Sequence, residues 1–470
     1  MFTTENLCKL ITKLGLLTFN IELTKNTIPF APSRPILGFL PEFKKNRLNL
    51  STHLMETYGD IVQYKLGPHK TVMITHPDYI KHVLQENYNN YKKDYFYEDL
   101  KLVLGQGLVT SEGEFWRQQR KLVQPGFHRN QISRFAGIMV DQCDRMLESW
   151  SREVTNKFDL VEEMKKLTMS IVSLALFNTD LSHEANKLGI AINDSINFIN
   201  GKMESFIKLP QWFPTPKSTE FNRNFTIVKN TIMEMIAERR KSPNQTPDLL
   251  DMLMAAQDEE TGVGMSDQQL FDEIMTLFLA GHETTAHGLV WTIYLLDKYP
   301  EMEANLFEEL GQFPVAFHPE LKDLPDLSYT TATIKESMRM LPPVWGIGRE
   351  AVHDDLIGGY SIPHGMTVFI PIYQMHYHPE YWTEPEVFNP ERFLDEELEK
   401  KNRWVYLPFG GGPRQCIGNN FAIMEMQIVV AMIMRQFKLE LISAENIQLN
   451  PGVTLRPEEA VLMKIKTRNH

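Results

Sequence analysis

Cysteine is scarce in this 470-residue sequence, which has only three, at positions 8, 143 and 416. They lie far apart and are odd in number, so neither a disulfide framework nor a paired zinc motif is indicated. This usage favours a reducing cytoplasm. A lone cysteine is more often a small buried apolar residue than a ligand, and we interpret Cys8 and Cys143 in that way.

An excess of basic charge is also missing. The chain has 48 Lys and Arg against 60 Asp and Glu, a net charge of −12, which argues against a nucleic-acid partner. Runs of about 20 apolar residues, which a membrane span needs, are absent too. Residues 14–19 are apolar, but Lys13 and Glu22 flank them. We therefore expect residues 1–27 to be an N-terminal segment without a membrane anchor or signal peptide.

Apolar residues recur at helical spacing along most of the chain. This pattern predicts helices over residues 116–123, 131–150, 159–177, 222–241, 248–258, 267–299, 300–310, 329–340 and 419–438. Short strand-like pieces lie near both ends, over residues 60–66, 71–75, 350–352, 360–362, 367–371, 439–442 and 460–466. No repeat and no composition break divides the chain. We predict one mainly α domain with small β-sheets over residues 28–470, a large size for a single core.

The most informative segment is Phe-Gly-Gly-Gly-Pro-Arg-Gln-Cys-Ile-Gly, residues 409–418. Consecutive glycines let the backbone approach a bulky partner and adopt positive φ angles. Cys416 directly precedes the helix expected from Asn419, whose N-terminus favours a thiolate. Arg414 can pair with a carboxylate of a cofactor. A glycine-rich turn with an incidental cysteine explains the segment as well, whereas a P-loop would need a Lys-Ser/Thr pair.

Polar residues interrupt the long helix expected over residues 267–299. Gly281, Glu283, Thr284 and Thr285 are poor choices for a helix interior. They indicate either a kink with satisfied polar groups or a local opening that makes room for a ligand. Two other motifs, Glu336-x-x-Arg339 and Trp116-x-x-x-Arg120, each place two side chains on one helix face. Taken alone, such pairs are usually of little energetic value.

Residues 409–418 resemble the heme-binding signature of the cytochromes P-450, Phe-x-x-Gly-x-Arg-x-Cys-x-Gly, at all five fixed positions. The segments at 116–120, 280–285, 336–339 and 388–393 resemble further motifs of that family, in its order. The resemblance begins near Leu37 and reaches the C-terminus. Residues 308–325 are unusual in composition, but none of the motifs lies in that segment. It implies the triangular helical prism of the family around heme b, with Cys416 as the sulfur ligand that favours O–O cleavage.

The resemblance also implies roles for other residues. It assigns heme contacts to Trp116, Arg120, Arg349, Phe409 and Arg414, with the arginines near the propionates. It implies a buried structural charge network of Glu336, Arg339 and Arg392. It further implies that Thr284 hydrogen-bonds the bound oxygen and that Glu283 relays protons to a dry pocket.

By the same resemblance the protein is a monooxygenase that uses O₂ and two external electrons. The short remainder after Cys416 leaves no room for a reductase, so a separate ferredoxin or flavodoxin with its NAD(P)H reductase is expected. The basic cluster Arg117, Arg120 and Lys121 is a candidate docking site for it, and a solvated helix face with propionate contacts is the alternative.

Family position predicts the residues around the substrate: Tyr95, Phe96, Tyr97, Phe278, Ala280, Val344 and Trp345. We expect a fatty-acid-like substrate for this small-molecule site. The alternative is oxidative O-demethylation of a small methyl ether, a methylated sugar or a methoxy-aromatic, with release of formaldehyde. A peroxide-driven peroxygenase is also open. A heme-based sensor without turnover is disfavoured, because a sensor has no need of the proton delivery implied for Glu283 and Thr284.

Overall fold

The structure is a computed structural model, and it describes residues 27–468 apart from residues 153–156, 179–189, 192–193, 196–197, 200, 203–214, 243–247, 259–260, 315, 396–402 and 443–445. The expectation for the N-terminal segment therefore falls almost wholly outside the described residues. Among the helices in the described ranges, none is both long and apolar enough to cross a membrane.

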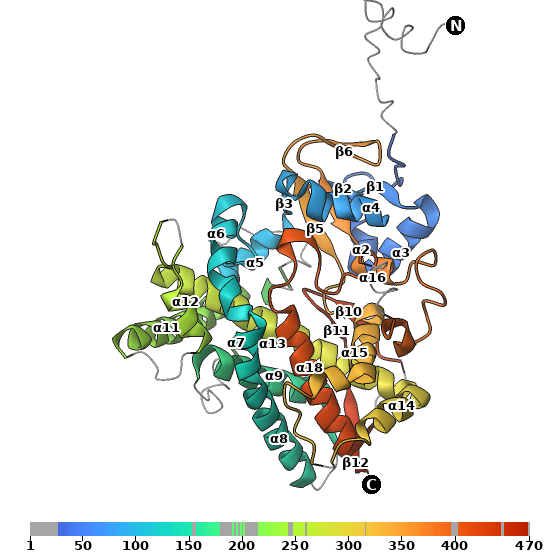
Figure 1. Ribbon diagram of the computed structural model, residues 1–470. Coiled ribbons are helices and arrows are strands. Elements are labelled where there is room, and N and C mark those ends of the chain that lie inside the picture. The colour runs from blue at the N-terminus through green and yellow to red at the C-terminus, as the bar shows by residue number, and fades with distance from the viewer. Residues whose placement is uncertain are drawn as a thin grey trace, which may run out of the picture.

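Helices make up most of the molecule (Figure 1). The longer ones are α3 (Arg47–Tyr58), α5 (Phe96–Leu104), α6 (Gly113–Val123), α8 (Ala136–Arg152), α9 (Leu160–Phe177), α11 (Pro216–Lys241), α12 (Leu249–Ala255), α13 (Asp267–Lys298), α14 (Pro300–Leu310), α15 (Ser328–Met340) and α18 (Asn419–Gln436). Short helices are α2 (Leu40–Lys45), α4 (Pro77–Lys81), α7 (Arg129–Ile132) and α16 (Ile372–His376).

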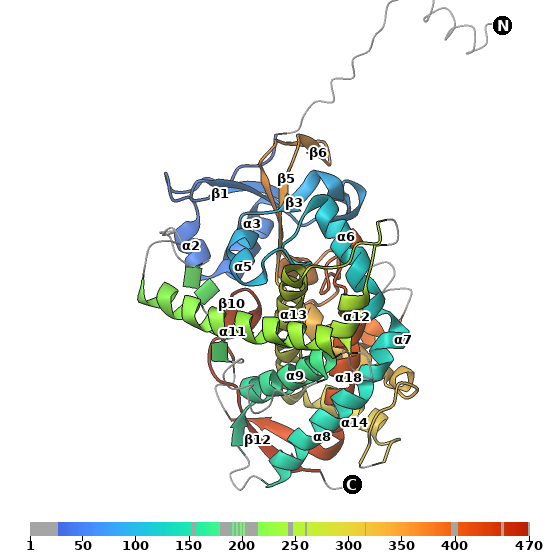
Figure 2. The same ribbon diagram turned by 90° about the vertical axis from the view of Figure 1, so that its left-hand side faces the viewer.

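Helix α13 runs through the middle of the molecule (Figures 1 and 2). A capping box of Ser266 and Gln269 starts it, because each side chain accepts a hydrogen bond from the other's backbone N–H. Nearly every residue from Leu270 to Leu296 is buried, as expected for a helix that is apolar almost all round. It packs against α9, α15 and α18.

Small sheets lie at opposite ends of the molecule (Figures 1 and 2). The larger has the order β1-β2-β8-β5-β3, formed by β1 (Ile61–Leu66), β2 (His69–Ile74), β8 (Thr367–Ile370), β5 (Ile347–Ala351) and β3 (Tyr91–Lys93). The other has the order β4-β12-β9, formed by β4 (Lys157–Asp159), β12 (Leu462–Thr467) and β9 (Phe437–Leu441). Two hairpins join β6 (Asp355–Ile357) to β7 (Tyr360–Ile362) and β10 (Leu449–Pro451) to β11 (Leu455–Pro457).

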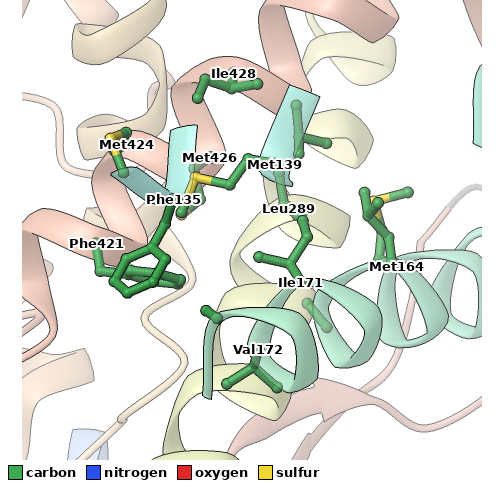
Figure 3. Packing of buried hydrophobic residues seen from close by; sticks show 14 of the residues in the cluster. Phe135, Met139, Met164, Ile171, Val172, Leu289, Phe421, Met424, Met426 and Ile428 are labelled. Atoms are coloured by element: carbon green, nitrogen blue, oxygen red, sulfur yellow. The ribbon is translucent and has the colours of Figure 1, made fainter. Parts of the chain in front are cut away.

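The main core fills the space between α8, α9, α13 and α18 (Figure 3). Its buried side chains include Phe135, Met139, Met164, Ile171, Leu289, Phe421, Met424, Met426 and Ile428. Methionine, an unbranched and adaptable side chain, is frequent on α18. Each of these side chains stabilises the fold by about 1.5–3 kcal/mol through burial. The core thereby fixes α18, and with it the cysteine segment that precedes this helix.

Candidate functional site

The segment from Phe409 to Cys416 forms a tight loop. The Cys416 N–H donates to the Phe409 carbonyl oxygen at 2.9 Å. Gly412 has a φ of +69°, and a Cβ there would overlap the carbonyl oxygen of Leu84. Both the left-handed backbone and the close approach therefore require glycine at this position.

Cys416 ends this loop just before the first turn of α18. Its side chain has accessible surface. Protein atoms nevertheless surround it closely enough for burial to raise the pKa of its thiol, opposed by a hydrogen bond from the Gly418 N–H and by the charge of Arg120. Cys416 is therefore partly enclosed by protein while its side chain keeps accessible surface. Arg120 also donates from Nη1 to the Gln415 carbonyl oxygen at 2.8 Å.

A second open surface lies on α13. Ala280 is exposed, and Gly281 and Thr284 are half-buried, although the helix is otherwise covered from Leu270 to Leu296. Positions four residues apart share a helix face, and the next position in this stripe, Gly288, contacts Met426 of α18. The open stripe thus lies on the side of α13 that faces α18, the helix that Cys416 precedes.

The local opening of the helix backbone, one of the two sequence interpretations, does not occur. Helix α13 is continuous from Asp267 to Lys298. Room arises because the side chain of Ala280 is small, while the Thr284 Oγ1 donates to the Ala280 carbonyl oxygen at 2.5 Å and lies against the helix. Gly281 instead allows the close approach of Val172 of α9.

Glu283 points to a different neighbour than Thr284. It is 4% exposed, and its Oε1 accepts a hydrogen bond from the Thr454 Oγ1 at 3.0 Å. Thr454 lies between β10 and β11, and its hydroxyl is also 3.2 Å from His287 Nδ1. Burial raises the pKa of Glu283, and the Thr454 hydrogen bond opposes this. Sequence reasoning missed Thr454 and His287, since no motif marks either.

A cluster of cations gathers beside the cysteine loop. Arg414 donates from Nη1 to the Ser111 carbonyl oxygen at 3.0 Å, pairs with Glu112, and lies over the Trp116 ring at 4.1 Å from its centroid. The pKa of Lys93 is well below its ordinary value, because the ammonium is desolvated and close to Arg349 and Arg414. Such a cluster favours an anion. The position of Lys93 in it was not foreseen; only the tertiary fold brings β3 next to β5.

The three residues expected in a charge network do meet. The Arg339 guanidinium binds both Glu336 carboxylate oxygens, at 2.7 and 2.8 Å, and both side chains are fully buried. Arg392 Nε is 3.3 Å from Glu336 Oε1. The backbone carbonyl of Arg339 contacts His376 Nδ1 at 2.9 Å, and His376 Nε2 accepts from the Leu407 N–H. Through His376, the network therefore fixes the backbone at Leu407, two residues before Phe409.

The residues expected around a substrate do not all gather. Tyr95 stacks on His69 at 3.8 Å and on Phe96 at 4.3 Å, next to the β1–β2 hairpin. Tyr97 lies under the Lys93 ammonium at 4.4 Å, within the cation cluster. Val344 is partly buried in the core that surrounds the larger sheet. Trp345 donates from Nε1 to the Gly452 carbonyl oxygen at 2.9 Å and so anchors the β10–β11 hairpin.

Phe278 is 3% exposed and shares a helix face with His282. That face lies about 200° around α13 from Ala280, so Phe278 does not share the exposed stripe of Ala280. The three basic residues of α6 that were expected to form one docking cluster each have a different partner. Arg117 pairs with Glu114 at 2.8 Å, Lys121 with Asp258 at 3.5 Å, and Arg120 points to the cysteine loop.

Comparison with known proteins decides the family. A profile of the family Cytochrome P450 matches residues 28–465. The chain belongs to the cytochrome P450 family. It is 31% identical over 427 residues to cyclooctat-9-en-7-ol 5-monooxygenase of Streptomyces melanosporofaciens, covering 90% of each chain. It is 29% identical to pentalenene oxygenase of Streptomyces avermitilis, over 90% of this chain and 92% of that one. Identity to the chloroplastic carotene epsilon-monooxygenase of Arabidopsis thaliana is 28%, over 88% of this chain and 81% of that one.

Family membership confirms the predicted fold class, a mainly α fold with small sheets, and the predicted cofactor, heme b. The P450 is accordingly a monooxygenase that needs a substrate, O₂ and redox partners. The described residues fit a heme. An accessible thiol precedes α18, an accessible stripe with a small side chain lies on the facing helix α13, and arginines suited to carboxylates lie beside the cysteine loop.

Proposed function

We propose that this P450 hydroxylates an apolar, terpenoid-type substrate with the sulfur of Cys416 bound to the heme iron. The observation that carries the proposal is a pair of accessible groups on two helices that pack together: the Cys416 thiol before α18 and the Ala280–Thr284 stripe of α13. The substrate class is supported by relatives named for cyclooctat-9-en-7-ol, pentalenene and carotene. Fatty-acid hydroxylation and O-demethylation stay predictions.

On the cysteine side, the protein's part is to hold a thiolate and an anion-bearing cofactor. The N-terminus of α18, the Gly418 N–H and Arg120 all favour negative charge on the Cys416 sulfur. Arg349 and Arg414 would supply positive charge for the propionates, and the Trp116 ring packs against the Arg414 guanidinium. When bound, the heme supplies the activation of O₂ and its insertion into a C–H bond.

On the α13 side, the protein's part is to exclude bulk water and deliver protons. Ala280 leaves space, and Thr284 offers a hydroxyl there. Glu283 is the nearest carboxyl along the helix, and burial raises its pKa, which favours the protonated form. A carboxyl and a hydroxyl at neighbouring helix positions, shielded from bulk water, would suit proton delivery to the heme site.

Electrons come from a separate ferredoxin or flavodoxin in this proposal, in a reducing cytoplasm. A groove of about 1010 Å³ runs along the outer side of the cysteine loop and includes Phe409, Gly411 and Gln415. Lys335 and Arg403 are the charged groups among its described lining residues. Such a groove favours an acidic partner more than the divided cluster on α6 does. Charge reversal at Lys335 should slow reduction and weaken its salt dependence.

The proposal is tested by adding terpenoid hydrocarbons, fatty acids and methyl ethers to the ferric protein and recording the heme spin-state shift. We expect tight saturable shifts with cyclic hydrocarbons and hydroxylated products on turnover. Formaldehyde release from a methyl ether, or shifts with fatty acids alone, would overturn the substrate class. Cys416→Ser should abolish the red-shifted Soret band of the reduced CO complex, and retention of that band would contradict the ligand assignment.

A further inference from the structure

The buried hydrogen bond between helix α13 and the β10–β11 hairpin has no part in the roles described so far. Glu283 and Thr454 are 171 positions apart in sequence, and their side chains meet at 3.0 Å. Both are about 4% exposed. A buried hydroxyl placed on a buried carboxyl is a specific arrangement, because either group without the other would carry a desolvation penalty.

The hairpin that carries Thr454 is anchored on several sides. Trp291 of α13 donates from Nε1 to the Leu455 carbonyl oxygen at 3.0 Å. The Leu455 N–H donates to the Pro343 carbonyl oxygen at 2.8 Å, and Trp345 reaches Gly452 as described. Thr454 thus sits on a rigid support, and its hydroxyl is held at a fixed position beside Glu283.

A single hydroxyl proton links Glu283 to His287. When the Glu283 carboxyl is ionised, Thr454 donates to it, and the second contact of the hydroxyl, 3.2 Å from His287 Nδ1, must then be accepted from an Nδ1–H. When Glu283 is protonated, the carboxyl can donate to Thr454, and the hydroxyl proton turns toward His287 Nδ1. The hydroxyl of Thr454 therefore joins the Glu283 carboxyl and the His287 ring in one hydrogen-bonded chain.

We propose that Thr454 is a positioning residue for proton delivery, which fixes the Glu283 carboxyl and connects it to the His287 ring. This inference rests on the proposed role of Glu283. The groups that face this cluster from the packed elements are Lys165 of α9, Arg456 of β11 and His282 of α13. His282 and His287 are both buried and stay neutral, because burial lowers the pKa of each.

Thr454→Val keeps the shape of the side chain and removes the hydroxyl, whereas Thr454→Ser keeps the hydroxyl. Loss of a hydrogen bond to a carboxylate corresponds to about a tenfold effect. We expect Thr454→Val to raise the ratio of hydrogen peroxide to product about tenfold and Thr454→Ser to restore coupling. Thr292→Val is the matched control, because Thr292 is equally buried on α13 and bonds only to the Gly288 carbonyl oxygen among the described contacts.

A spectroscopic readout separates this role from a general loss of stability. The infrared band of the protonated Glu283 carboxyl is identified as the band lost in Glu283→Gln. Since the Thr454 hydrogen bond lowers the pKa of Glu283, its removal should move the titration midpoint of that band to higher pH. Thr292→Val should leave the midpoint unchanged.

The outcomes distinguish the inference from the proposed function. If Glu283→Gln leaves the peroxide ratio unchanged, the proposed role of Glu283 is overturned. If Glu283→Gln raises the ratio while Thr454→Val behaves like Thr292→Val, the inference alone fails. Because His287 acts through Thr454, adding His287→Phe to Thr454→Val should raise the ratio no further; a multiplied effect would contradict the coupling.

Discussion

Arg339 carries a charge in the core of the protein, so its stability depends on the partners around it. Its guanidinium is fully buried and bound to Glu336, and further contacts run to the His376 and Val387 carbonyl oxygens. The Tyr377 and Trp382 rings lie 5.6 and 5.3 Å from its central carbon. A buried ion pair adds little when complete, but removal of one partner leaves an uncompensated charge in the core.

We therefore expect Arg339→Ala to destabilise the fold by about 3–5 kcal/mol, with weaker heme retention because Leu407 loses its support. Denaturant unfolding followed by far-UV circular dichroism measures the first effect, and the heme-to-protein absorbance ratio measures the second. Arg152→Ala breaks an exposed helical pair with Glu148 and serves as control. Its effect should stay within about 0.5 kcal/mol, and an equal effect of the two substitutions would contradict the network.

Among the elements, the first half of α13 holds the loop that follows α5. Asp272 Oδ2 accepts from the Gln106 N–H at 2.8 Å, and Glu273 Oε2 accepts from the Leu108 N–H at 3.0 Å. Gly107 lies so close to Thr276 that a Cβ would overlap its hydroxyl. Burial, together with the charge of Asp272, raises the pKa of Glu273 to about 8, although the Leu108 hydrogen bond opposes this.

This raised pKa makes stability depend on pH in a defined direction. Between about pH 4.5 and 8 the folded protein holds a proton on Glu273 that the unfolded chain has lost. The folded state therefore loses stability as pH rises through this window, by up to about 5 kcal/mol from this group. Glu273→Gln should flatten the dependence, measured by urea unfolding at pH 6 and pH 8. An unchanged slope would show that Glu273 is ionised in the folded protein.

At the scale of the whole molecule, the core that surrounds α13 continues from α8 to α18 and on to β9 and β12. The larger sheet has hydrophobic clusters of its own, and we propose that these and the α13 core form one domain over residues 28–470. We expect a single calorimetric transition for the heme-loaded protein, and limited proteolysis should release no stable subfragment. Two transitions, or a resistant fragment that folds alone, would contradict a single domain.

Local patterns predicted the helices well where an apolar face is long. The helices expected over residues 267–299 and 329–340 correspond to α13 and α15, within about two residues. The helix expected from residue 222 begins earlier, at Pro216, because a Thr215–Ser218 capping box starts it. The strand-like pieces expected over residues 60–66 and 71–75 are present as β1 and β2, which pair antiparallel. Such features depend on neighbours in sequence, which a periodic pattern records.

The sequence by itself determined the family, the cofactor and the cysteine segment, because the glycines, Arg414 and Cys416 are close together in the chain and their spacing is specific. Only the tertiary structure decided which side chains meet across long separations. It joined Glu283 to Thr454 and Lys93 to the arginine cluster, and it placed Tyr95 and Phe96 against the β1–β2 hairpin region. These contacts depend on how the elements pack around α13, and no local spacing encodes that packing.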